Sequence, residues 1–214
     1  MSQRTEIVAM AAREIGYKEG RNNATKYGAW YGMNNNPWCA QFVSWCAAQA
    51  GIPVTVIPKL AYVPYIYSFY NASGRYKARG SGYVPKPGDI ILFGNNDHVG
   101  IVEKVANGSV VTIEGNTSGV GNSSNGDGVY RRTRALNNSW IKGYCIPDYI
   151  EEEEDMARYN TLAEVPSYAK DTVKELMAKG ILKGNEKGLD LSEDMLRSLV
   201  IQMRVFEAAG IKLK

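Results

Sequence analysis

The chain has 214 residues, of which 44% are apolar and 22% charged, with a formal net charge of +3. This balance is typical of a globular protein and excludes disorder over most of the chain, while the length suits two domains better than one. No apolar run reaches the roughly 18 residues that span a bilayer, which excludes a transmembrane helix.

Apolar residues with helical spacing predict a helix over 5–15, and Pro37 and Gly51 bound a second predicted helix over 39–50. A third short helix is expected after Pro64. Beyond Gly88 the period becomes that of strands, which are predicted over residues 89–93, 98–105, 109–114, 129–134 and 140–146. Turns rich in Gly, Asn and Asp separate them, as in an antiparallel meander. Helices followed by a sheet predict an α+β domain over residues 1–150.

Five consecutive acidic residues, 151–155, interrupt this pattern. They repel one another and stay solvated, so residues 151–157 are predicted to be a linker, with an exposed helix start as the alternative. The tail, residues 158–214, is predicted to be a small α-helical domain with two helices, over residues 166–179 and 192–209.

Charge is distributed unevenly between these parts. Residues 1–150 carry 15 Lys and Arg against 9 Asp and Glu, whereas the remainder carries 10 against 13. A modest positive charge suits an acidic cell-wall polymer. Because the basic residues are scattered rather than clustered on one face, nucleic acid is not expected as a partner.

Cys39 lies where the second predicted helix begins, directly after Pro37 and Trp38. Unpaired N–H groups and the positive end of the helix dipole favour the thiolate there, which is the nucleophilic form of cysteine. The alternative is a small buried apolar residue, the commonest role of a free cysteine. Cys46, two turns along the same helix face, and Cys145, at a strand end, are predicted to be core residues.

His98 is the only histidine, and it begins a predicted strand. An imidazole there can act as base for a thiol and as acid for a leaving amine; an ordinary packed or surface histidine is the alternative. A third group usually orients such an imidazole. Glu114 ends the next strand, so a hairpin would bring it to the same edge, unless it is only a solvated carboxylate. Asn116 either orients the imidazole, polarises a carbonyl or simply occupies a turn.

Four blocks of sequence follow one another along the chain: 37–46, 88–93, 98–102 and 113–116. Together they resemble the CHAP domain (cysteine, histidine-dependent amidohydrolase/peptidase), a papain-like family of peptidoglycan hydrolases, over roughly residues 5–147. The resemblance implies that Cys39 is the nucleophile, His98 the base, Glu114 the orienting acid and Asn116 the accompanying polar residue.

No cofactor and no metal are expected. Some phage members of the CHAP family bind calcium through an acidic loop ahead of the nucleophile, but residues 19–36 contain many Asn and no Asp. A single histidine also argues against a histidine-rich zinc site.

The tail resembles one divergent S-layer homology (SLH) repeat through residues 162–166, 169–176 and 179–184. The resemblance implies binding to a secondary cell-wall polymer, although residues 194–197 depart from the Thr-Arg-Ala-Glu-like segment of that family. The alternative is a helical hairpin that assists folding or forms a homo-oligomer. Two helices are expected to expose an apolar stripe, made of Val173, Leu176, Leu196, Val200 and Met203.

The sequence thus predicts an endolysin-type enzyme, an N-acetylmuramoyl-L-alanine amidase or peptidoglycan endopeptidase with a cysteine nucleophile. Trp30, Tyr31 and Trp38 are expected to hold the glycopeptide on an aromatic surface; the alternative is that such aromatic residues belong to the core. A non-catalytic cell-wall-binding protein is the alternative. The first residues lack the features of a signal peptide, so we expect the protein to stay in the host cytoplasm until release through a membrane pore, without inserting into the membrane.

Overall fold

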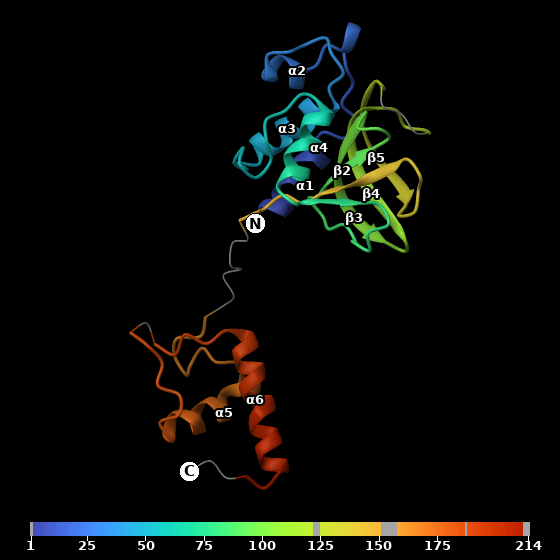
Figure 1. The fold of residues 1–214 in the computed structure, drawn as a ribbon. Helices are drawn as coiled ribbons and strands as arrows, with labels where there is room; N and C mark the ends of the chain where they lie inside the picture. The colour runs from blue at the N-terminus through green and yellow to red at the C-terminus, as the bar shows by residue number, and fades with distance from the viewer. Residues whose placement is uncertain (1, 122–124, 151–157, 187, 212–214) are drawn as a thin grey trace. The chain divides into compact units, whose positions relative to one another are not determined.

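The computed structural model describes residues 2–121, 125–150, 158–186 and 188–211. Its contacts divide the chain into two compact units, residues 1–152 and residues 153–214 (Figure 1). The predicted linker, residues 151–157, lies outside the described residues. Within the described ranges, no helix has both the length and the apolar character needed to cross a membrane.

The first unit places its helices before its sheet, which confirms the predicted α+β class. The helices are α1 (Gln3–Arg13), the 3-10 helix η1 (Arg21–Asn23), α2 (Lys26–Tyr31), α3 (Cys39–Gln49) and α4 (Val63–Ala72). The strands are β1 (Tyr76–Ala78), β2 (Ile90–Phe93), β3 (His98–Ala106), β4 (Ser109–Thr117), β5 (Gly128–Ala135) and β6 (Ile141–Cys145). The predicted set lacks η1, α2 and β1, because such short segments carry too little periodicity.

The sheet has the strand order β1-β6-β2-β3-β4-β5, and every neighbouring pair is antiparallel. Strands β2 to β5 form the predicted meander. The last strand does not continue it: β6 returns across the sheet and pairs with β2, with Ile90 opposite Cys145. The prediction of a simple meander is therefore wrong for β6, whose partner is set by long-range packing and not by a turn.

The central strand β2 is buried on both faces of the sheet. Along β2, Ile90 and Leu92 belong to the core beneath the helices, whereas Ile91 and Phe93 belong to a second cluster on the opposite face. Helix α3 packs on β3 and β4, and α1 and α2 pack on α3 (Figure 1). The first residues of β3 and the last residues of β4 therefore lie beneath a helix layer, out of contact with water.

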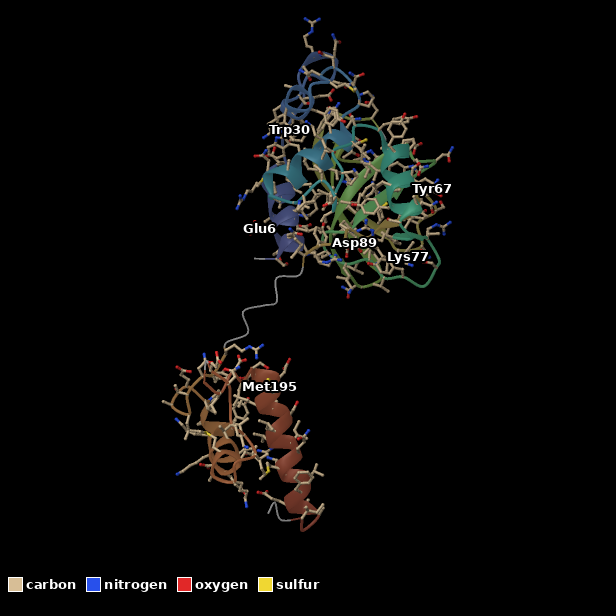
Figure 2. The ribbon with its side chains drawn as sticks, turned by 60° about the vertical axis from the view of Figure 1, so that its left-hand side comes forward. Glu6, Trp30, Tyr67, Lys77, Asp89 and Met195 are labelled. Carbon is tan, nitrogen blue, oxygen red and sulfur yellow. The ribbon has the colours of Figure 1, made fainter. Side chains whose placement is uncertain are left out.

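A buried carboxylate ties α1 to the start of β2. Asp89 (Figure 2) accepts hydrogen bonds from Arg4 Nη1 at 2.9 Å, from Tyr83 Oη at 2.7 Å and from the backbone N–H of Lys86 at 2.8 Å. The preceding Gly88 has a φ of 85°, and a Cβ there would lie 3.2 Å from the backbone of Arg4. Only glycine combines that conformation with so close an approach.

The second unit contains α5 (Ser167–Ala178) and α6 (Glu193–Ala208), in agreement with the predicted helical tail. The prediction of an exposed apolar stripe is wrong, because all five of its residues are buried: Val173, Leu176, Leu196, Val200 and Met203. Segments outside the helices complete this core, since Val165, Leu189 and Leu191 pack against it. Two backbone hydrogen bonds, between Tyr159 and Leu191, hold the flanking segments together.

Candidate active site

Helix α3 begins at Cys39, as predicted, and the residue before it fixes that position. Trp38 Nε1 donates to Glu19 Oε2 at 2.6 Å, and the indole stacks on the ring of Tyr27 with centroids 5.2 Å apart. Trp38 has no exposed surface. The prediction that Trp38 contacts substrate on an exposed aromatic surface is therefore wrong. Its side chain instead holds the start of α3 from inside the fold.

Strand β4 approaches the start of α3 at Gly115. A Cβ at this position would lie 2.6 Å from Trp38 Cζ3 and 2.7 Å from Phe42 Cβ, closer than any side chain permits. Glycine inside a strand often marks such a close approach between two segments. Because Glu114 and Asn116 flank Gly115, the contact brings both of them to the end of the helix that carries Cys39.

His98 begins β3 directly opposite Phe93 of β2, and its side chain is fully buried. The imidazole packs against two rings that also stack on each other: its centroid lies 5.6 Å from those of both Phe93 and Trp140. Its Nε2 lies 3.0 Å from Glu114 Oε2, which confirms that the two predicted residues meet at one edge of the hairpin. Gly100 leaves the space that this requires, because a Cβ there would lie 2.6 Å from Glu114 Cγ.

Two groups act on the imidazole of His98 against the effect of burial. Burial lowers the pKa of His98, because it removes solvation from the charged form. Interactions with Cys39 and Glu114 outweigh burial and raise that pKa from 6.5 to about 9. Glu114 occupies Nε2, whereas Nδ1 is buried without a hydrogen-bond partner among the described residues, so Nδ1 is the nitrogen left to interact with the Cys39 thiol. The imidazole is therefore protonated at neutral pH.

Glu114 is held as an anion although it is fully buried. Burial raises the pKa of a carboxyl group, but the hydrogen bonds and charges of His98 and Arg134 outweigh it and hold the pKa of Glu114 below 4.5. Arg134 donates from Nη1 to Oε1 and from Nη2 to Oε2, the latter at 3.1 Å. The hydroxyl of Thr112 also donates to Oε1. Every oxygen of this carboxylate thus has a donor.

The sequence analysis missed Arg134 and Thr112. One signal was available, because Tyr130, Arg132 and Arg134 alternate along β5 and therefore share a face of the sheet. The alternation does not say which of these three side chains is buried. That depends on the register with β4, in which Thr112 pairs with Arg132.

Asn116 is fully buried inside β4 and does not lie in a solvent-exposed turn. Its φ is 55°, and the pairing of β4 with β5 shifts register between Glu114 and Thr117. Asparagine tolerates this left-handed conformation better than most residues. The irregularity keeps the amide of Asn116 inside the fold, one residue beyond Gly115 and its contact with α3.

The remaining cysteines lie in the core, as predicted. Cys46 and Cys145 are fully buried, and neither forms a disulfide. Burial raises the pKa of both thiols well above the ordinary value, because a thiolate there would lose its solvation. Cys39 differs from them in having a protonated imidazole as its neighbour.

Trp30 and Tyr31 are half-buried on α2, where Trp30 is labelled in Figure 2. The ammonium group of Lys59 lies over both rings, 4.5 Å from the centroid of Trp30 and 5.1 Å from that of Tyr31. Their side chains are open to solvent in part, unlike that of Trp38. A role in substrate binding stays a prediction for these two residues.

The structure thus brings together a thiol, an imidazole, a carboxylate and a guanidinium. The first three are what nucleophilic acyl transfer uses: a nucleophile, a proton carrier and a group that orients the carrier. In the part of the chain that the structure describes, no cluster of three or more His, Cys, Asp or Glu side chains is arranged to hold a metal ion.

Comparison with known families finds a match to the CHAP domain over residues 30–116. No curated protein matches the sequence significantly. Two solved structures are similar: one titled "The crystal structure of Ly7917" (17% identity, TM-score 0.42, covering 67% of this chain) and a mutated form of the Resuscitation Promoting Factor Interacting protein RipA (18% identity, TM-score 0.40, covering 69%). This chain spans 62% of the length of each.

Both structural similarities are weak and add no argument about activity. The family match does bear on the site, because the matched residues include Cys39, His98, Glu114 and Asn116. Residues 30–116 of this chain are therefore similar to the CHAP domain.

Proposed function

We propose that the first unit is a cysteine peptidoglycan hydrolase of the endolysin type, either an N-acetylmuramoyl-L-alanine amidase or a peptidoglycan endopeptidase. The observation that carries the proposal is the buried imidazole of His98, which contacts Glu114 at 3.0 Å and interacts with the Cys39 thiol. The CHAP match supports the reaction class. The resemblance of the sequence blocks to that family of peptidoglycan hydrolases supports the substrate class.

In the proposed reaction the Cys39 thiolate attacks an amide carbonyl carbon and forms a C–S bond, while the carbonyl electrons move onto oxygen. The backbone N–H of Cys39, at the first position of α3, has no acceptor within the helix and is a donor for this oxyanion. When the intermediate collapses, the C–N bond breaks and His98 gives its proton to the leaving amine. Water, losing a proton to the now neutral imidazole, attacks the thioester; the C–S bond breaks, the acid product leaves, and the Cys39 thiolate and the protonated His98 are restored.

Other residues hold these groups in place. Glu114 orients the imidazole and favours its charged form. Asn116 is proposed to hold either the imidazole or the substrate carbonyl, since it is buried next to the contact between β4 and α3. Trp30 and Tyr31 are proposed to contact the glycopeptide through their partly exposed rings.

Purified Gram-positive cell walls test the proposal. The protein should lower the turbidity of a wall suspension, and mass spectrometry of the products should show a new free amino group with a new carboxyl group at one bond type. Treatment with iodoacetamide, which alkylates an accessible thiolate, should abolish both effects. Wall binding without new products would instead favour a non-catalytic cell-wall-binding protein.

For the tail we propose an anchoring role, through binding to a secondary cell-wall polymer as the SLH-like segments imply. Self-association into a homo-oligomer is the competing proposal, since α6 exposes Ile201 and Val205. Light scattering and wall pull-down of the full chain, compared with a chain that ends at Ile150, separate the two. Loss of wall binding with an unchanged mass supports anchoring, and a fall from dimer to monomer supports assembly.

A further inference from the structure

A buried arginine, Arg134, forms hydrogen bonds with Glu114, the carboxylate that contacts His98. The side chain of Arg134 is only 4% exposed. In the register of the sheet Arg134 lies opposite Val110, and its guanidinium reaches along β4 to Thr112 Oγ1 at 3.3 Å and to both oxygens of Glu114. The planar fork of a guanidinium matches a carboxylate with two parallel hydrogen bonds, so this contact fixes the plane of the carboxylate as well as its position.

Aromatic rings hold the same guanidinium. Its Cζ lies 4.6 Å from the ring centroid of Phe93 and 5.0 Å from that of Trp140. These two rings also stack with the imidazole of His98. Arg134 and His98 therefore share their aromatic neighbours, and Glu114 bonds to both. The arrangement leaves the carboxylate no freedom to turn away from the imidazole.

Arg131, on the same strand, shows what such a pair looks like at the surface. Its Nε and Nη2 contact the two oxygens of Glu103 at 2.6 and 2.8 Å, but its side chain is 49% exposed. Water solvates an exposed pair, which contributes little. A buried carboxylate without a counter-charge, in contrast, takes up a proton. The buried pair made by Arg134 therefore adds to the effect of His98 in keeping Glu114 charged, whereas the exposed pair made by Arg131 contributes little.

We propose that Arg134 is a positioning residue for the Cys39–His98 pair, acting through Glu114, which it keeps both ionised and correctly oriented. The charged groups around Glu114 are His98 from β3 and Arg134 and Arg132 from β5, and Cys39 from α3 interacts with the imidazole of His98. If Glu114 were neutral, it would no longer favour the charged imidazole. The consequence for catalysis rests on the proposed function, whereas the effect on the imidazole does not.

The single histidine makes the test direct, because the side-chain imidazole signals in an NMR spectrum belong to His98. Protonation of Glu114 changes those signals and gives an inflection on the acid side of the titration, and the lowered pKa of Glu114 places this inflection below the usual range of a glutamate in the wild-type protein. Arg134→Gln should move this inflection upward by about 1–3 pH units, the usual effect of a nearby opposite charge. Arg134→Lys, which keeps the charge but loses the fork, should move it less. Arg131→Gln should leave it unchanged.

Wall lysis provides the second readout. The acid limb of its pH profile should move upward in Arg134→Gln together with the NMR inflection. A folded Arg134→Gln protein whose inflection matches that of Arg131→Gln overturns the proposal, because a merely structural arginine would change only the unfolding temperature. If Arg134→Gln does not fold, the inflection of Arg134→Lys is compared with that of Arg131→Gln instead, and a match between those two overturns the proposal. A shifted inflection in a protein that never cuts walls would refute the proposed function and leave the role of Arg134 standing.

Discussion

Replacing Glu114 by glutamine should remove most of the pH dependence of stability between pH 6 and pH 9. In the folded protein the pKa of the fully buried His98 is about 9, against an ordinary value of 6.5. A raised pKa stabilises the fold in full below 6.5, and this contribution is lost as the pH rises through 9. At about 1.4 kcal/mol per pH unit, the interval corresponds to about 3 kcal/mol of unfolding free energy.

Glu114→Gln removes one of the two groups that raise the pKa of His98 and leaves burial, which lowers it. The pKa of His98 should therefore fall toward 6.5 or below, and the loss of stability between pH 6 and pH 9 should shrink to less than half of its wild-type value. Urea unfolding at the two pH values measures this. Tryptophan fluorescence reports on the first unit alone, because every tryptophan lies within residues 30–140.

Glu103→Gln is the matched control. It removes a carboxylate from the neighbouring strand β3, where Glu103 pairs with the exposed Arg131 and does not contact His98. This variant should keep the wild-type pH dependence. If Glu114→Gln kept it as well, with the NMR titration of His98 unchanged, the carboxylate would have no part in holding the imidazole charged, and the reasoning about the site would be refuted.

Three other predictions concern the contact at α3, the proton on His98 and the tail. Gly115→Ala should lower the unfolding free energy by about 1–3 kcal/mol and slow wall lysis, because its Cβ overlaps Trp38. Gly119→Ala, whose Cβ would lie 3.4 Å from its nearest neighbour, should change neither quantity. Wild-type stability and lysis of Gly115→Ala would contradict the close approach. Lysis should fall above pH 9 as the proton that the leaving amine needs is lost from His98; a rate still constant at pH 10 would contradict this. A chain ending at Ile150 should keep its thiol reactivity and cut soluble muropeptides, but act less efficiently on intact walls, and equal efficiency would refute anchoring by the tail.

The sequence was sufficient to predict the order of the longer helices and strands, because amphipathic periods and turn residues are local, but not the short η1, α2 and β1. It was also sufficient to bring His98 and Glu114 together, since consecutive strands of a hairpin place their ends at one edge. It failed for β6, which pairs with β2 across the sheet, because no local turn encodes that choice.

The sequence also failed to predict which side chains are buried, again because burial depends on contacts between distant parts of the chain. Trp38 reads as an exposed aromatic next to a reactive cysteine, but Glu19 and Tyr27, far from it in sequence, enclose it. In the sequence Arg134 is one of several basic residues, and only the strand register shows that its side chain contacts Glu114. Such roles depend on which distant side chains pack together, and periodicity contains no information on that.

The measurement that tests the central claim most directly compares two cysteines of one helix. Cys39→Ser and Cys46→Ser are assayed for the release of new amino groups from purified walls, with urea unfolding as a check on folding. Cys39→Ser should fold normally and release none, because a serine hydroxyl beside His98 does not ionise as a thiol does. Cys46→Ser should lose stability, by placing a hydroxyl in the packed core, and keep its activity per folded molecule. A folded Cys39→Ser protein that still cleaves walls would contradict the assignment of Cys39 as the nucleophile.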